Sequence, residues 1–322
     1  MEFNNQSFAV PDLEAVIDRE PLIVSPDTPL TEAIALMSEV RNLSGRVEGD
    51  RTNSEFSSSN DFSCVLIAAD SKLLGILTER DIVKLAAEKL AFESVIVADV
   101  MTQPVRTWEK SNLQDVFAAL FLFRRYQIRH LPIVDEEKRL IGIVSPETIR
   151  QAIKPYNLLR LIRVKDVMNT NIIHASATDT VLDVARLMTR HRVSCVIITE
   201  EDEAEAILLP VGIITERDIL QFQVLQISLD NIEARQVMSA PLFLLNPEDS
   251  LLAAQEEMQL RRVRRLVVAW NWGQGLGIIT QTSMLRVFDP IEMYSVIEVL
   301  QSTVQQLERE KAELLALLNR RN

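Results

Sequence analysis

The chain has 322 residues, of which 47% are hydrophobic and 25% are charged, a composition typical of a globular protein with a large core. Its formal net charge of −12 argues against nucleic acid or an anionic membrane surface as a partner, because either requires a basic surface. The first residues lack the basic and apolar regions of a signal peptide, and no apolar run is long enough for a membrane helix, so we expect a cytoplasmic protein. Cys64 and Cys195 are too few for a disulfide framework or a zinc site, and we expect both to be buried.

An internal repeat organises the chain from its first strand onward. A glycine-led motif ends a strand four times, and its glycines (75, 142, 212 and 277) are 67, 70 and 65 residues apart. A second marker, Val-Met after Asp or Gln, opens repeats two, three and four at Asp99, Asp166 and Gln236. Each repeat predicts the order β-α-β-β-α, with the first helix capped in turn by Thr28, Ser111, Asp179 and Asp249. We therefore expect an α/β (α+β) protein of four repeats, at residues 10–88, 95–154, 162–224 and 233–288.

Two of the repeats carry polar insertions. Residues 42–61 of the first repeat are rich in Ser, Asn and charge, which indicates a surface loop. Residues 200–205 of the third repeat are acidic and predict a solvated turn. A single unit of about 60 residues buries little surface, so we expect the repeats to pair.

The last segment, residues 290–322, has a different pattern. Apolar residues recur at alternating spacings of four and three from Met293 to Leu318, interrupted by Lys311. This heptad seam predicts a parallel, dimeric coiled coil. One amphipathic helix folded back on the body is the alternative.

The motifs together resemble the CBS domain family, whose members occur as tandem pairs called Bateman modules. The resemblance rests on the motif Gly-h-h-Thr/Ser-x-x-Asp (h, hydrophobic), on the Asp-Val-Met lead-in and on the strand from Arg129 to Asp135, and it covers about residues 10–288. It implies two modules with clefts for AMP, ADP, ATP or related adenosyl ligands. Four repeats followed by a coil are similar to the sensory region of bacterial histidine kinases or of enzymes that form cyclic nucleotides.

The Thr-Glu-Arg-Asp segments of repeats one and three are the candidate nucleotide sites. A helix N-terminus attracts phosphate, the Thr hydroxyl can donate to it, and the Asp carboxylate can accept from both ribose hydroxyls. A plain helix-capping box is the alternative interpretation of the same residues. Thr148 and Ser283 replace the Asp in repeats two and four, which puts those clefts in doubt. The candidate residues are Thr78, Arg80 and Asp81 in the first repeat, and Thr215, Arg217 and Asp218 in the third.

The resemblance also implies that a basic pair before the second strand of the partner repeat contacts the phosphates. Arg129 and His130 stand there in repeat two, and Arg264 and Arg265 in repeat four. Each module then has one competent cleft. For residues 261–265, a solvated basic helix end is the alternative.

These residues predict a regulatory sensor of adenine nucleotides that signals through the coil to an output domain. A structural dimerisation scaffold with non-functional clefts is the alternative. We do not expect an enzyme, because the three histidines are scattered and no Walker-type phosphate loop is present. No metal or other cofactor is expected, apart from the regulatory nucleotide, and the expected partner is a second copy of the chain.

Overall fold

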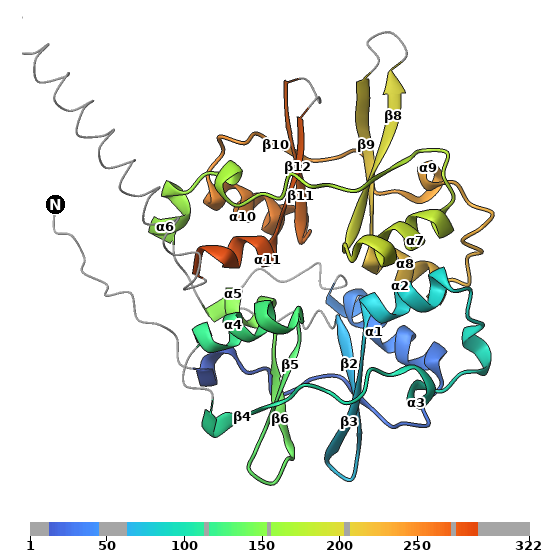
Figure 1. Ribbon diagram of the computed structural model, residues 1–322, viewed down its shortest axis with the longest axis vertical. Helices are drawn as coiled ribbons and strands as arrows, with labels where there is room; N and C mark the ends of the chain where they lie inside the picture. Colours follow the sequence, from blue (N-terminus) through green and yellow to red (C-terminus); the bar gives the residue numbers. More distant parts are fainter. Residues whose placement is uncertain are drawn as a thin grey trace, which may run out of the picture.

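Four three-stranded sheets surround a common centre in the computed structural model of the protein (Figure 1). The structure describes residues 13–44, 63–112, 116–152, 156–202, 207–271 and 275–288. In each sheet the first strand is parallel to the second, and the second is antiparallel to the third. The parallel pair requires a crossover, which a helix supplies in every repeat. The expected α/β fold of four β-α-β-β-α units is confirmed.

The elements recur in the same order in each repeat. Repeat one contains β1 (Ile23–Val24), α1 (Leu30–Ser44), β2 (Cys64–Ala69), β3 (Lys72–Thr78) and α2 (Glu79–Ala87). Repeat two contains β4 (Trp108–Glu109), α4 (Val116–Tyr126), β5 (Leu131–Val134), β6 (Leu140–Val144) and α5 (Pro146–Ala152). Repeat three contains β7 (His174–Ser176), α7 (Val181–His191), β8 (Cys195–Asp202), β9 (Ile207–Thr215) and α8 (Glu216–Val224). Repeat four contains β10 (Leu244–Leu245), α10 (Leu251–Arg261), β11 (Arg265–Trp270), β12 (Gly275–Thr280) and α11 (Gln281–Met284).

Short helices lie between the repeats, and others lie before the first strand, inside repeat two and after the last helix of repeat four. The α-helical ones are α3 (Val97–Val100), α6 (Tyr156–Leu161) and α9 (Ala234–Val237). The 3₁₀ turns are η1 (Leu13–Val16), η2 (Phe92–Ser94), η3 (Lys110–Asn112), η4 (Val164–Asp166) and η6 (Leu285–Phe288).

Two of the expected helix caps are wrong by one residue. Thr180 caps α7 and Ser250 caps α10, each accepting a hydrogen bond from the backbone N–H three residues later. Asp179 and Asp249 instead close the preceding turns by accepting from the N–H groups of Ser176 and Asn246. A Thr or Ser next to an Asp offers two possible caps, and the turn takes the Asp in both repeats.

The polar insertions and the tail are only partly covered. The helix α1 continues to Ser44, so the first three residues of the expected loop are helical, and the rest of that loop lies outside the described residues. The strand β8 continues to Asp202 through the start of the expected acidic turn. The expected coiled coil at 290–322 lies outside the described residues. Within the described residues, no helix has the length and apolar character needed to span a membrane.

The two sequence markers form two sides of one contact. A Cβ added to Gly75 would lie 2.2 Å from the Met101 sulfur, and one added to Gly212 would lie 2.2 Å from the Met238 sulfur. Gly277 faces Met168 in the same way. The lead-in of each of these repeats therefore lies against the last strand of the partner repeat. A side chain at the glycine position would collide with the lead-in methionine. Repeats one and two form one module, and repeats three and four form the other.

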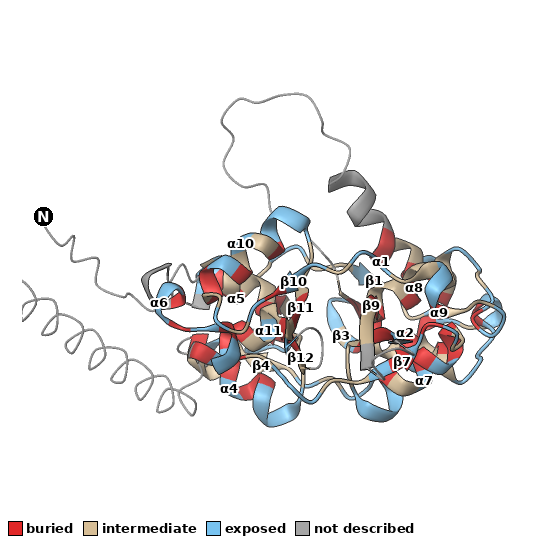
Figure 2. Ribbon diagram, turned by 90° about the horizontal axis from the view of Figure 1, so that it is seen from above, coloured by how far each residue is buried: buried red, intermediate tan, exposed pale blue. Residues whose placement is uncertain are grey.

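The two modules then stack so that repeat one faces repeat three and repeat two faces repeat four. In Figure 1, repeats one and two form the lower half and repeats three and four the upper half. Helix α2 packs on α7 and α8, and α5 packs on α11. One buried hydrophobic cluster joins repeats one and three, and a second joins repeats two and four. Buried and exposed positions alternate along the helices, as amphipathic packing requires (Figure 2).

Candidate functional site

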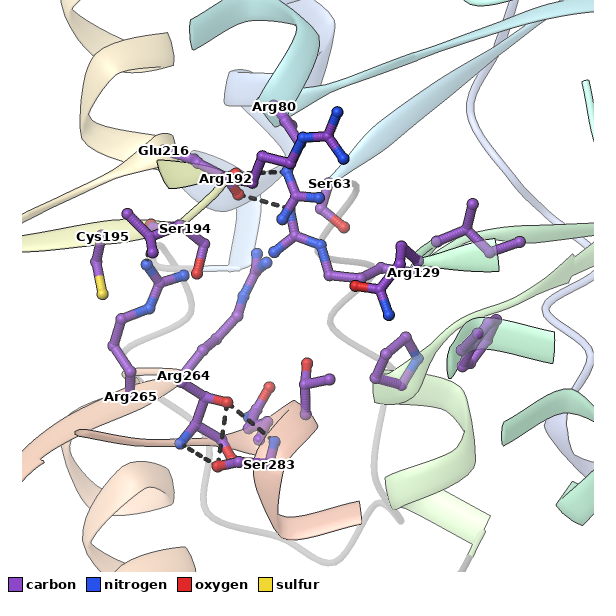
Figure 3. Close-up of a pocket in the computed structure, with 18 of the residues that line it drawn as sticks. Ser63, Arg80, Arg129, Arg192, Ser194, Cys195, Glu216, Arg264, Arg265 and Ser283 are labelled. Carbon is purple, nitrogen blue, oxygen red and sulfur yellow. Dashed lines mark hydrogen bonds and ion pairs between the residues drawn. The ribbon is translucent and has the colours of Figure 1, made fainter. Parts of the chain in front are cut away.

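A cavity of about 1150 Å³ lies at the centre, and residues from all four repeats line it (Figure 3). Ligand pockets for small molecules usually measure roughly 300–1,000 Å³, so this cavity has room for more than one small ligand. Its wall carries eight Lys or Arg side chains and four Asp or Glu side chains. In a chain whose net charge is −12, this is a local excess of cationic side chains. The cations are Arg80, Lys84, Arg124, Arg129, Arg192, Arg264, Arg265 and Arg286, and the acids are Asp18, Asp81, Glu147 and Glu216.

The Thr-Glu-Arg-Asp segments form capping boxes. Thr78 ends β3, and its hydroxyl and backbone N–H donate to the Asp81 carboxylate at 2.7 and 2.8 Å. Thr215 and Asp218 repeat this geometry, with both distances at 2.8 Å. The cap uses one oxygen of each carboxylate (Oδ2). At Asp81 the other oxygen, Oδ1, accepts from Thr102 Oγ1 at 3.4 Å, which is a long and weak contact.

Repeats two and four build the same turn with hydroxyl groups. Ser145 N donates to Thr148 Oγ1 at 3.1 Å, and Thr280 N donates to Ser283 Oγ at 2.8 Å. A hydroxyl has a single oxygen, which the cap already uses, whereas a carboxylate has a second one. This difference is consistent with the doubt about the clefts of repeats two and four.

Buried ion pairs connect the two modules through the middle positions of these segments. Glu216 accepts from Arg129 Nη2 at 2.5 Å and from Arg80 Nε at 3.2 Å. Glu79 accepts from Arg217 Nη1 at 3.0 Å, and its other oxygen lies 4.0 Å from Arg264 Nη1. The side chains of Glu216 and Glu79 are 1% and 3% exposed. Each glutamate thus pairs with one arginine from each repeat of the opposite module.

Sequence reasoning missed both glutamates. It assigned Arg80 and Arg217 to the ligand, whereas the structure pairs them with Glu216 and Glu79. The available signal was that Glu and Arg occur together in repeats one and three, while Pro146 and Gln281 replace the Glu in repeats two and four. Repeats one and three are the pair that meets across the module interface.

His130 is not a cation in this site. Burial, together with the nearby charges of Arg129, Arg264 and Arg80, lowers its pKa to about 3. The neutral ring makes a 2.7 Å hydrogen bond between its Nε2 and Ser63 Oγ. In the second module Arg265 occupies the equivalent position and donates to the carbonyl of Ser194. The positive charge that the sequence assigned to two residues of repeat two is therefore carried by Arg129.

The cysteines lie beside these positions. Cys64 is buried, as expected, and Cys195 is only half-buried. Burial raises the pKa of both thiols above the ordinary value, so both are protonated at neutral pH.

Six of the ten expected site residues line the cavity, and they come from both modules. These six are Arg80, Asp81, Arg129, His130, Arg264 and Arg265. Thr78, Thr215, Arg217 and Asp218 are not among the described residues that line it. Asp81 and Arg129 thus line the same cavity, and the pairing of Asp218 with Arg264 in one cleft stays a prediction. Figure 3 shows Arg80 and Arg129 reaching Glu216, with Arg264 directed towards them.

Comparison with solved structures agrees with the four-repeat fold. A crystal structure from Methanocaldococcus jannaschii, of a protein proposed to be an archaeal homologue of γ-AMPK, has a TM-score of 0.68 at 21% identity and covers 86% of this chain and 100% of that one. An uncharacterised Pyrococcus horikoshii protein has a TM-score of 0.54 at 13% identity and covers 86% of this chain and 99% of that one. At these identities the similarity concerns the fold.

Curated proteins match shorter stretches. An uncharacterised Methanopyrus kandleri protein is 33% identical over 131 residues, which is 40% of this chain and 64% of that protein. The inosine-5'-monophosphate dehydrogenase of Thermoplasma acidophilum is 27% identical over 42% of this chain and 22% of the enzyme. The L-aspartate semialdehyde sulfurtransferase of M. jannaschii is 32% identical over 47% of this chain and 27% of the enzyme. The matches thus span less than two thirds of these relatives' own lengths.

The family comparison covers most of the chain. A model of the CBS domain matches residues 13–88, 97–155, 164–224 and 234–289. These four matches coincide with the four sheets, and the contacts between lead-ins and last strands pair them into two Bateman modules. The chain belongs to the CBS domain family.

Proposed function

We propose that this protein is a regulatory sensor that binds adenine nucleotides, or a related adenosyl ligand, and carries out no reaction itself. The observation that carries the proposal is the cation-rich central cavity, which Asp81 lines together with Arg80 and Arg129. A nucleotide combines a diol with an anion, and this cavity offers a carboxylate acceptor for the first and guanidinium donors for the second. The CBS family membership supports the same ligand class.

The relatives support a regulatory role. Segments similar to this chain occupy about a quarter of a dehydrogenase and of a sulfurtransferase, two enzymes with unrelated reactions. Because the two reactions are unrelated, a segment found in both enzymes is not expected to catalyse either of them. We propose that it senses a ligand on their behalf, and that this chain does the same for an output domain.

In this proposal the ribose hydroxyls bind the Oδ1 atom of Asp81, and the phosphates lie near Arg80 and Arg129. The second module uses Asp218 with Arg264 and Arg265 in the same way. The adenine ring lies on the apolar wall at Ile172 and Ile173, which line the cavity. Thr78 and Thr215 cap the helices whose N-termini face the phosphate.

Transmission of the signal is the second part of the proposal. We propose that residues 290–322 form a parallel coiled coil that joins two copies of the chain and passes the ligand state onward. Light scattering on the full chain and on a chain cut after Phe288 tests this part. Monomers of the shortened chain support the coil, and equal dimerisation of both chains contradicts it.

Calorimetric titration of the full chain with AMP, ATP and S-adenosylmethionine tests the sensor itself. We expect about two nucleotides per chain, one for each retained Asp. No binding of any of the three would leave the dimerisation scaffold as the function. Four equivalent strong sites would contradict the view that Thr148 and Ser283 disable their clefts.

A further inference from the structure

Glu216 occupies a place where a ligand anion would be expected, beside two arginines that line the cavity. Glu216 lines the cation-rich cavity, is 1% exposed, and contacts both Arg129 and Arg80. Arg129 retains 26% exposure of its side chain and Arg80 retains 41%, so both arginines can still reach a ligand in the cavity. The carboxylate comes from the opposite module, across the interface between α2 and α8.

We infer that Glu216 is an internal counter-anion that holds Arg80 and Arg129 and thereby sets which anions the cavity accepts. Glu79, which does not line the cavity among the described residues, acts in the same way only on Arg264. The inference rests on the proposed function for the identity of the natural ligand, but the anion site can be tested without any nucleoside. The ligand class it selects is a polyphosphate: a diphosphate or triphosphate group, free or attached to a nucleoside.

Competition between carboxylate and phosphate is the physical basis. An anion that approaches Arg129 must share or replace the 2.5 Å contact with Glu216. A single phosphate group is too small to contact all of these arginines at once, so it gains little by exchanging with the Glu216 carboxylate. Several linked phosphates can contact Arg80, Arg129 and Arg264 together, and each further charge-assisted hydrogen bond adds to the gain. A cationic sulfonium ligand has no such gain.

The ionisation state of Glu216 supports this role. Burial acts to raise the pKa of this carboxyl, and the charges of Arg129 and Arg80 outweigh burial and hold the pKa below its ordinary value. The group is therefore an anion throughout the neutral range.

The ion pairs that the two glutamates form across the module interface differ in length. Glu79 lies 4.0 Å from Arg264, at the outer limit of an ion pair, whereas Glu216 lies 2.5 Å from Arg129. An entering polyphosphate therefore meets less competition from Glu79 at Arg264 than from Glu216 at Arg129. Since each glutamate belongs to the opposite module, an anion that displaces it also weakens a contact between the modules. Binding in the cavity is thereby coupled to module packing.

The test uses the full chain, inorganic tripolyphosphate and orthophosphate, at constant ionic strength, with calorimetry. Glu216→Gln removes the competing charge and keeps the side-chain shape. We expect it to bind tripolyphosphate about 10-fold tighter than the unsubstituted chain, since Arg80 and Arg129 then offer their charge-assisted hydrogen bonds without a competing carboxylate. We also expect a lower melting temperature without ligand, and weak orthophosphate binding in both proteins. A purely structural Glu216 would lose stability and gain no affinity.

Glu147→Gln is the matched control, because Glu147 also lines the cavity but pairs with its own helix neighbour Arg150. This substitution removes one negative charge from the cavity and leaves the Arg129 contact intact. We expect the affinity for tripolyphosphate to change by less than about 3-fold, because the Glu147 charge is partly exposed and screened. Glu216→Asp keeps the charge but shortens the reach, and we expect an intermediate gain if Glu216→Gln does not fold.

The outcomes separate the two proposals. Equal or weaker tripolyphosphate binding by Glu216→Gln, or an equal gain from Glu147→Gln, overturns the inference, as does the absence of tripolyphosphate binding by every variant. If tripolyphosphate binds as expected but neither AMP nor ATP binds more tightly than its phosphate group alone, the adenine-nucleotide proposal fails and the counter-anion inference stands.

Discussion

Arg217 donates from Nη1 to Glu79 Oε1 at 3.0 Å, across 138 residues of sequence. The same contact recurs with the roles of the repeats exchanged, from Arg80 Nε to Glu216 Oε1 at 3.2 Å. Such reciprocity is the property of a two-fold symmetric interface, here formed within one chain. The repeated Glu-Arg dipeptide therefore joins the modules.

The first prediction is a coupling energy between Glu79 and Arg217. Their side chains are 3% and 12% exposed, so loss of either partner leaves a buried charge less well compensated. In a double-mutant cycle of Glu79→Gln and Arg217→Gln, we expect each single variant to lower the free energy of unfolding by about 3 kcal/mol, with a coupling of about 1–3 kcal/mol. Denaturant unfolding of the four proteins measures it.

The surface pair Arg186–Asp183 is the control for that cycle. Both side chains are 50% exposed, and we expect little or no coupling between them, because solvent screens the pair. A coupling between Glu79 and Arg217 no larger than this one would mean that the cross-module pairs do not hold the modules together.

The second prediction separates ribose binding from helix capping. Asp81→Ala and Asp218→Ala each remove a carboxylate and the hydrogen bonds that it accepts from the capping Thr, whereas Thr148→Ala and Ser283→Ala remove the equivalent hydrogen bond of a hydroxyl alone. We expect the first two to weaken nucleotide binding in their own module by about 10- to 150-fold, the equivalent of one hydrogen bond to a charged group. The second two should reduce stability by about 0.5–1.5 kcal/mol, the usual contribution of one hydrogen bond, and leave affinity unchanged. Unchanged nucleotide binding in a chain that carries both Asp substitutions would establish the capping box as the whole role of these residues.

The third prediction concerns the pH dependence of stability. His130 has a folded-state pKa of about 3, below the ordinary value of 6.5 that applies to the unfolded chain. The unfolded chain therefore binds the proton more tightly, and the contribution of His130 to stability is present above pH 6.5 and is lost as the pH falls towards 3. At about pH 5.5 we expect a loss on the order of 1.4 kcal/mol relative to about pH 7.5.

Urea unfolding at the two pH values measures this loss. Other groups titrate in the same range, so the informative quantity is the difference from His130→Gln, which should lack this part of the pH dependence. His174→Gln, an exposed position in β7, is the control and should behave as the unsubstituted chain. An identical pH dependence in all three proteins would show that the His130 ring accepts a proton without unfolding.

The fourth prediction ranks the motif glycines by what an added methyl group would meet. At Gly142 it would lie 2.3 Å from the backbone oxygen of Asp18, which accepts a hydrogen bond from Ile143 N at 2.8 Å. At Gly75 it would lie 2.2 Å from the Met101 sulfur, on a flexible side chain, and at Gly277 it would lie 3.0 Å from the Met168 sulfur. We expect Gly142→Ala to destabilise most, by about 1–3 kcal/mol, and Gly277→Ala least.

Thermal unfolding of the three variants gives the order. Gly75→Ala and Gly277→Ala serve as internal comparisons, since each places a methyl group against methionine. If Gly142→Ala lowered the melting temperature least of the three, the contact between Asp18 and β6 would not hold the first module together.

The sequence by itself determined the repeats and their strand and helix order, and the family resemblance implied their pairing into two modules. The motif glycine, the threonine at a helix start and the alternating apolar residues stand within a few positions of one another. Such local patterns can be recognised in a single sequence. The prediction of helix caps failed where two neighbouring residues could both cap the helix, as with Asp179 and Thr180 at the start of α7. The family resemblance followed from these same local features.

The tertiary structure decided which repeats face each other, and with that the chemistry of the centre. Glu79 and Glu216 meet arginines more than 130 residues away, and only this packing converts them from helix-surface residues into buried anions. The same packing surrounds His130 with Arg80, Arg129 and Arg264 and makes it neutral. The ionisation state of a side chain and its ion-pair partners depend on burial and on residues distant in the sequence. Neither can be predicted from the spacing of residues along the chain.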